Sequence, residues 1–181
     1  TSAYISDIEK KKLELAVPYL PLTKENSSEI IESYLKKTDA TMHSAGGLIS
    51  NAKDLSKWLL VQLNNGKVDG KQIIDSKALS LSHLSYTDSL HFSKNLQATL
   101  TYTLGWNKYQ KDNDTIEMLY HTGGFKGNLT GMYLYPKKNL GFATMTNSEW
   151  GGYITAALTS YVVNWWDDPQ KAESKLIEDI K

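Results

Sequence analysis

The pattern of apolar and polar positions changes character near residue 99. From there to residue 146, short apolar runs alternate with turn-forming residues, a pattern typical of β-strands. Connections this short favour antiparallel neighbours. The sequence therefore predicts an antiparallel sheet of three or four strands, with turn signals at 111–114, 123–124 and 136–139. The predicted strands cover residues 100–110, 115–122, 129–135 and 140–146.

Segments with a helical pattern lie both before and after the predicted sheet. Residues 151–166 place their large apolar side chains on one face, which predicts a helix that covers the sheet. Asp167, Asp168 and Pro169 end it, and the charged tail predicts a last short helix. Residues 51–64 and 75–81 predict two more helices, with Ser50 as the cap of the first and Asp75 as the cap of the second.

The remaining segments give weaker patterns. Residues 1–24 are predicted to be extended or irregular, since Pro18 and Pro21 break helices. Residues 27–37 place Ile30, Ile31, Tyr34 and Leu35 on one helical face, which favours a helix. Residues 68–71 predict a turn, and residues 83–98 predict a long loop or insert.

The predicted fold class is therefore α+β, with an antiparallel sheet and a covering helix in residues 99–181. Residues 1–98 are expected to form a mainly helical and loop part of the same domain. A chain of 181 residues can enclose a core, and its 40% apolar and 22% charged residues are ordinary for a globular protein. Its formal net charge of +0 gives no field that would attract nucleic acid, and no apolar run is long enough for a membrane span. The absence of cysteine excludes disulfides and thiol catalysis.

The segment with the most specific chemistry is His121-Thr122-Gly123-Gly124 at the end of a predicted strand. Three other segments accompany it: residues 44–60, where Ala45-Gly46-Gly47-Leu48 precedes a helix; Tyr102-Thr103-Leu104-Gly105-Trp106; and residues 141–148, which end in Thr146-Asn147-Ser148. Together these four segments resemble, in order and spacing, the penicillin-recognising serine hydrolases. That β-lactamase-like group includes class C β-lactamases, D-alanyl-D-alanine peptidases, D-aminopeptidases and esterases. The third box of the group is Lys-Thr-Gly, where this chain has His121-Thr122-Gly123.

The resemblance also implies residues that this chain does not clearly supply. The family nucleophile is the serine of a Ser-x-x-Lys box that opens a helix, and a Tyr-x-Asn or Ser-x-Asn box follows it. Ser33-x-x-Lys36 lies late in a predicted helix, and Ser50-x-x-Lys53 falls where the family uses a capping serine. Ser93-Lys94-Asn95 has the form of the second box but lies in a polar stretch. We therefore expect the nucleophile half of the domain to lie outside this chain.

The resemblance implies roles for five consecutive residues. His121 would face the pocket as the catalytic residue of this segment, donating toward a substrate carboxylate or moving a proton. Thr122, Gly123, Gly124 and Phe125 would bind substrate, the glycines by admitting its backbone and Phe125 by giving its N–H to an oxyanion hole. The alternative interpretation is a strand histidine with a satisfied partner, an ordinary β-branched residue and a plain hairpin bend.

No cofactor or metal is expected. His43, His83 and His91 match no ligand spacing with His121. Because imidazole is only partly charged near neutral pH, His121 in place of lysine argues against β-lactam hydrolysis as the native task. The resemblance implies an acyl-enzyme acting on amide or ester substrates, with small molecules or peptides as substrates and a periplasmic or extracellular location. The alternative is a non-catalytic module that keeps the pocket wall for binding or dimerisation. The expected protein partner is the N-terminal half of the domain or a second, self-associating copy.

Overall fold

The computed structural model describes residues 1–22, 29–41, 46–87, 91–93, 98–111, 116–166 and 168–179. The chain divides into two compact units. One comprises Thr1–Ile49, Gly123–Thr130 and Thr144–Lys181, and the other comprises Ser50–Thr122 and Gly131–Ala143. These two units do not test the predicted boundary between residues 98 and 99, which therefore stays a prediction.

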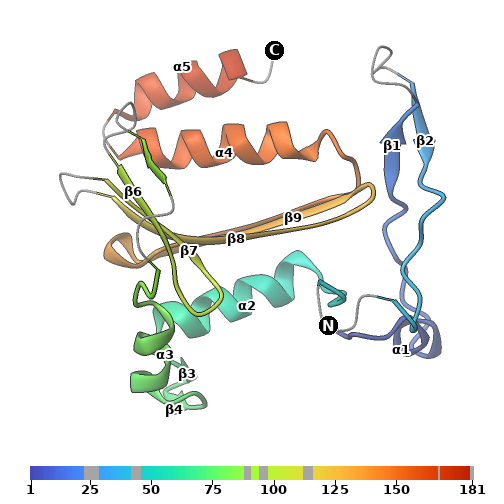
Figure 1. The fold of residues 1–181 in the computed structure, drawn as a ribbon, viewed down its shortest axis with the longest axis horizontal. Helices are drawn as coiled ribbons and strands as arrows, with labels where there is room; N and C mark the ends of the chain where they lie inside the picture. The colour runs from blue at the N-terminus through green and yellow to red at the C-terminus, as the bar shows by residue number, and fades with distance from the viewer. Residues whose placement is uncertain are drawn as a thin grey trace. The chain divides into compact units, whose positions relative to one another are not determined.

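The largest sheet has the strand order β10-β9-β8-β7-β6-β5, of which Figure 1 labels β6, β7, β8 and β9. Consecutive strands are neighbours, which confirms the predicted antiparallel sheet and the α+β fold class. Strand β10 is the last in the order, and β8, β9 and β10 each carry residues of both units. The strands are β5 (His91–Ser93), β6 (Ala98–Tyr102), β7 (Asn107–Lys111), β8 (Glu117–Phe125), β9 (Asn128–Tyr135) and β10 (Leu140–Thr146).

The unit of Ser50–Thr122 and Gly131–Ala143 has its core beneath helix α2 (Ala52–Leu63). Leu59 from this helix packs with Trp106, Leu119 and Leu134, all of which are buried. Asn51 begins the helix, because its side-chain oxygen accepts a hydrogen bond of 2.9 Å from the backbone N–H of Asp54. The predicted helix at 51–64 is confirmed, but the side chain that caps it is that of Asn51 rather than the predicted Ser50.

A small hairpin and a short helix also belong to this unit. Strands β3 (Lys67–Val68) and β4 (Lys71–Gln72) form a hairpin whose turn residues, Asp69 and Gly70, both have positive φ. Helix α3 (Ser76–Ser82) begins as predicted at Asp75, whose carboxylate accepts from the backbone N–H of Ala78 at 2.8 Å.

In the other unit, helices α4 (Gly151–Trp165) and α5 (Pro169–Asp179) pack against each other (Figure 1). Both helices were predicted. Strands β1 (Tyr19–Pro21) and β2 (Ile30–Glu32) pair antiparallel. Helix α1 (Ile5–Lys10) was not predicted within residues 1–24. Its first two N–H groups, of Ile5 and Ser6, donate to the Asp39 carboxylate, a cap so distant in sequence that no local pattern shows it.

Three further predictions are wrong. Residues 29–37 contain strand β2 rather than a helix, because Ile30 and Ile31 extend along β1 and Ser33 then turns the chain through hydrogen bonds with Leu35. The predicted strand 100–110 is two strands. Its interruption is a tight turn in which the hydroxyl of Thr103 bonds both the N–H and the carbonyl of Trp106.

The third correction concerns the glycine pair. Strand β8 continues through Gly123 and Gly124 to Phe125, and the chain turns at Lys126 and Gly127 instead. In the part of the chain that the structure describes, no helix is both long and apolar enough to cross a bilayer. The predicted insert at 83–98 contains the short strand β5, while residues 88–90 and 94–97 lie outside the described residues.

Candidate functional site

The second half of strand β8 carries all five of the predicted site residues. Strand β7 pairs with β8 only from Glu117 to Tyr120, so His121–Phe125 extend past the end of β7. His121, Thr122, Gly123 and Gly124 are exposed, and Phe125 is half-buried. The strand therefore changes along its length from a buried segment around Leu119 to a segment with an accessible backbone.

His121 is held by hydrogen bonds to both of its ring nitrogens. Nδ1 lies 2.8 Å from the carbonyl oxygen of Thr122, and Nε2 lies 3.3 Å from the hydroxyl oxygen of Tyr102. A carbonyl oxygen can only accept, so Nδ1 must carry a proton. In the neutral ring Nε2 then holds the lone pair and accepts from the Tyr102 hydroxyl.

Gly123 and Gly124 are not required by backbone conformation, since neither has a positive φ. A side chain at Gly123 would lie 2.9 Å from the hydroxyl of Thr130, and one at Gly124 would lie 3.1 Å from Leu129. Gly127 in the following turn differs, because its φ is +84° and an added Cβ would lie 2.8 Å from the backbone nitrogen of Tyr19. The turn therefore requires Gly127, whereas Thr130 and Leu129 of β9 leave little room for a side chain at Gly123 and Gly124.

The serines considered as nucleophiles lie in unsuitable positions. Ser33 is 1% exposed, follows strand β2 and donates to the carbonyl of Leu35, while Lys36 pairs with Glu32. Ser50 precedes the first capping residue of α2, and Lys53 is exposed in the first turn. Neither string has its serine inside the first turn of a helix. Of the Ser93-Lys94-Asn95 string, Lys94 and Asn95 lie outside the described residues.

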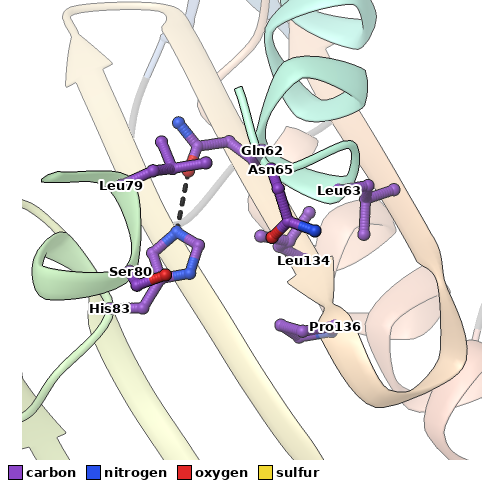
Figure 2. Close-up of a pocket in the computed structure, with 8 residues that line it drawn as sticks. All are labelled: Gln62, Leu63, Asn65, Leu79, Ser80, His83, Leu134 and Pro136. Carbon is purple, nitrogen blue, oxygen red and sulfur yellow. Dashed lines mark hydrogen bonds between the residues drawn. The ribbon is translucent and has the colours of Figure 1, made fainter. Parts of the chain in front are cut away.

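A separate cavity of about 190 Å³ lies between α2, α3 and the end of β9 (Figure 2). His83 projects into it, and its Nε2 lies 2.7 Å from the side-chain oxygen of Gln62, which is 4% exposed. The His83 ring also meets Trp106 edge-on, with ring centroids 6.4 Å apart. Burial lowers the pKa of His83 from its ordinary value of 6.5, with Glu117 opposing the shift and Lys108 adding to it. The lining residues are Gln62, Leu63, Asn65, Leu79, Ser80, His83, Leu134 and Pro136.

Sequence reasoning did not assign Tyr102 to the site. In the sequence, Tyr102 is only the first residue of a segment that resembles the family. No local pattern predicts its closeness to His121, because that closeness depends on the register of β6, β7 and β8. Among the described residues there is no group of three or more His, Cys, Asp or Glu that could hold a metal ion. His43 and the side chain of His91 lie outside this description.

The chain belongs to the β-lactamase family, whose family profile matches residues 4–153. Its fold is similar to that of the octameric penicillin-binding protein homologue from Pyrococcus abyssi, with a TM-score of 0.66 and 21% sequence identity. The similarity covers 90% of this chain but only 34% of that protein's chain, so the chain spans about a third of its length. A search of curated proteins finds no significant match in sequence.

Proposed function

We propose that this chain is the C-terminal part of a β-lactamase-like serine hydrolase that acts through an acyl-enzyme on amide or ester substrates. The nucleophile, its lysine base and the second-box tyrosine would come from the N-terminal half of the domain. Membership of the family and the partial coverage of the penicillin-binding protein homologue support this proposal. The observation that carries it is the exposed half of β8, which presents His121 next to two glycines on a strand edge not covered by β7.

The proposed chemistry follows from the arrangement of that half-strand. An extended substrate could lie along the backbone of Thr122, Gly123 and Gly124, as a peptide adds to a free strand edge. His121 donates from Nδ1 to the Thr122 carbonyl, and its Nε2, which accepts from the Tyr102 hydroxyl in the unliganded chain, would have to exchange that partner to take up a proton beside such a substrate. The N–H of Phe125 would contribute to an oxyanion hole together with the N–H of the nucleophile.

The test begins with the coding sequence upstream of this chain. A Ser-x-x-Lys and a Tyr-x-Asn box there would identify the nucleophile half, and the complete protein would then be expressed. A fluorophosphonate probe should label its nucleophilic serine, as seen by mass spectrometry. We expect His121→Ala in the complete protein to lower turnover of an activated ester by about 10²–10⁴-fold, the usual contribution of a proton-transferring group.

The matched control is His83→Ala, because His83 is bonded to Gln62 and lies in the separate cavity. This variant should retain turnover if it remains folded. The present chain alone should hydrolyse neither activated esters nor a chromogenic β-lactam. Turnover by the chain alone that Ser50→Ala abolishes would make Ser50 the nucleophile and refute the proposed division of the domain.

The second candidate function is a non-catalytic binding or dimerising module. Its specific support is strand β10, which is the last strand in the sheet order and includes Met145 with 37% exposure. An unpaired strand edge can pair with a second copy or with the missing half of the domain. Sedimentation at several concentrations should reveal self-association, and Met145→Lys should reduce it. A complete protein that is never labelled by the probe, combined with such self-association, would favour this alternative.

A further inference from the structure

The accessible half of β8 lacks the support of its neighbour β7. Strand β7 pairs with β8 only as far as Tyr120, so the hairpin tip Gly123–Thr130 extends beyond that pairing. Past Tyr120, β9 remains the paired neighbour of β8 in the part of the chain that the structure describes. The tip belongs to the same compact unit as Thr1–Ile49 and Thr144–Lys181. Contacts within this unit therefore determine how firmly the tip is held.

Residues 17–19 lie against the turn of this hairpin. A Cβ added to Gly127 would lie 2.8 Å from the backbone nitrogen of Tyr19 and 2.9 Å from its carbonyl oxygen. The same Cβ would lie 2.9 Å from Cβ of Pro18. The two segments approach this closely because Gly127 has no side chain. The position of the turn is therefore coupled to the position of residues 17–19.

Asn147, which follows β10, holds residues 17–19 in this place. Its side-chain Nδ2 donates to the carbonyl of Val17 at 2.8 Å. Its backbone carbonyl accepts from the N–H of Tyr19, also at 2.8 Å. Tyr19 continues the contact through a parallel bridge with Ser148. One asparagine thus contacts the segment at two points, once through its backbone and once through its side chain.

We propose that Asn147 is a positioning residue for the accessible half of β8. By holding residues 17–19 against the turn at Gly127, it fixes the hairpin tip where β7 gives no support. The meaning of this role for catalysis rests on the proposed hydrolase, in which an extended substrate lies along residues 122–124. Asn147 acts through residues 17–19 and is not assigned contact with the substrate.

The experiment measures amide hydrogen exchange in the whole chain by NMR and compares the wild type with Asn147→Asp. The substitution keeps the shape of the side chain but replaces the donating N–H₂ group with a carboxylate, which repels the Val17 carbonyl. Amides bonded within Gly123–Thr130 should exchange about 3–10-fold faster, the effect of losing about one hydrogen bond. Amides of residues 117–120, on the same strand beside β7, should be unchanged. Unchanged exchange at the tip of a folded variant would overturn the proposal, as would equal acceleration in both halves of β8.

The matched control is Asn164→Asp, which makes the same chemical change in the same unit. Nδ2 of Asn164 donates to the Ser160 carbonyl at 2.6 Å within α4. Because that hydrogen bond stays within one helix, its loss should leave exchange at the hairpin tip unchanged. Acceleration at the tip equal to that in Asn147→Asp would show an effect of the added charge and overturn the proposal.

A pair of glycine variants tests the contact independently, and decides the matter if Asn147→Asp does not fold. Gly127 and Gly70 both lie in hairpin turns with positive φ, +84° and +78°, but nothing lies within 4 Å of a Cβ at Gly70. Alanine at Gly70 therefore adds only backbone strain, whereas alanine at Gly127 also displaces residues 17–19. The amide of Tyr19 should exchange faster in Gly127→Ala and not in Gly70→Ala. Equal exchange of this amide in the two variants would overturn the proposal.

Kinetics of the complete protein separate positioning from a general structural defect. Asn147→Asp should raise the KM of an extended peptide ester about 3–10-fold and leave turnover of a small activated ester unchanged, because only the peptide lies along β8. If the complete protein has no labelled serine but the tip loosens in Asn147→Asp, the proposed function fails and the positioning role stands. If the complete protein is active and Asn147→Asp changes neither exchange at the tip nor this KM, the positioning role fails and the proposed function stands.

Discussion

Two histidines of the same unit, His83 and His121, show how burial and hydrogen bonding separate a structural side chain from an accessible one. His83 is half-buried between α2 and α3, bonds to the buried Gln62 and meets the core residue Trp106 edge-on. His121 is exposed on a strand that has passed the end of its neighbour, with Nε2 near a tyrosine hydroxyl. The sequence singles out His121 through its motif, but it does not show which of the two imidazoles is buried or what each one bonds to.

The difference in partners has opposite consequences for the two rings. The polar partner of His83 is itself buried, so removing the imidazole would leave a desolvated oxygen without a hydrogen bond. The partners of His121 are accessible to water, which can replace the imidazole at little cost. Stability should therefore depend on the surroundings of His83, and function on those of His121.

The largest effect is expected from Leu134→Ala, in the core beside the His83 cavity. Leu134 is 0% exposed, packs with Leu59 and Leu119, and lines the cavity. Deleting its side chain should join new empty space to the existing cavity and lower the free energy of unfolding by about 2–5 kcal/mol. Urea denaturation measures the loss. Leu104→Ala, at a leucine with 61% exposure in the same unit, is the control and should change stability by less than about 0.5 kcal/mol.

The next effect is expected from His83→Ala. The variant leaves the side-chain oxygen of Gln62 buried without its 2.7 Å hydrogen bond, which should cost about 1–3 kcal/mol of unfolding free energy. Combining it with Gln62→Leu should recover part of the loss, because the unpaired oxygen is then absent. If the loss of stability in the double variant equals the sum of the losses in His83→Ala and Gln62→Leu, the hydrogen bond contributes nothing. The contrast with His121 then rests on packing alone.

A smaller effect is expected from pH. Burial lowers the pKa of His83, so below its ordinary value of 6.5 the unfolded state takes up the proton first. The free energy of unfolding should fall as pH decreases through 6.5, until the pKa of the folded state is passed, and His83 should contribute no pH dependence above that window. Stability measured from pH 5 to 8 should show this slope. His83→Gln should flatten it, and an unchanged slope in that variant would contradict the assignment.

The smallest effect on stability is expected from His121→Ala. Water can replace the imidazole at the Thr122 carbonyl and the Tyr102 hydroxyl, so the free energy of unfolding should change by less than about 0.5 kcal/mol. Thermal denaturation of this variant beside His83→Ala gives the comparison directly. A loss as large as that of His83→Ala would make His121 a structural residue and remove the basis for the proposed site.

Much of the fold could be predicted where the pattern is local. The strand at 140–146 and the helix at 151–166 follow from apolar periodicity and turn signals, and Asp75 was identified as a cap because its partner is three residues away. The errors occur where a distant residue decides the local structure. Helix α1 receives its cap from Asp39, and Ile30 and Ile31 belong to a strand because β1 lies beside them.

The site residues also separate into those that a local motif identifies and those that only the fold brings together. A motif of consecutive residues identified His121–Phe125, and their roles in binding and catalysis stay predictions. The expected bend at Gly123 and Gly124 was wrong because glycine permits a turn without requiring one, and the continued strand is stabilised by its neighbours. Tyr102 could not be assigned, since 19 positions separate it from His121 and only the pairing of the intervening strands brings the hydroxyl within 3.3 Å of Nε2.

The sequence by itself determined the family, through four short segments in order, and the elements whose signals lie within a few residues of one another. The tertiary structure decided which histidine is held by a buried partner, where β7 ends beside β8, and which hydroxyl lies beside Nε2 of His121. The physical reason is the separation along the chain over which each interaction acts. Periodicity and capping act between residues within a turn or two of each other, whereas burial, strand edges and hydrogen-bond partners depend on which distant segments the fold brings together.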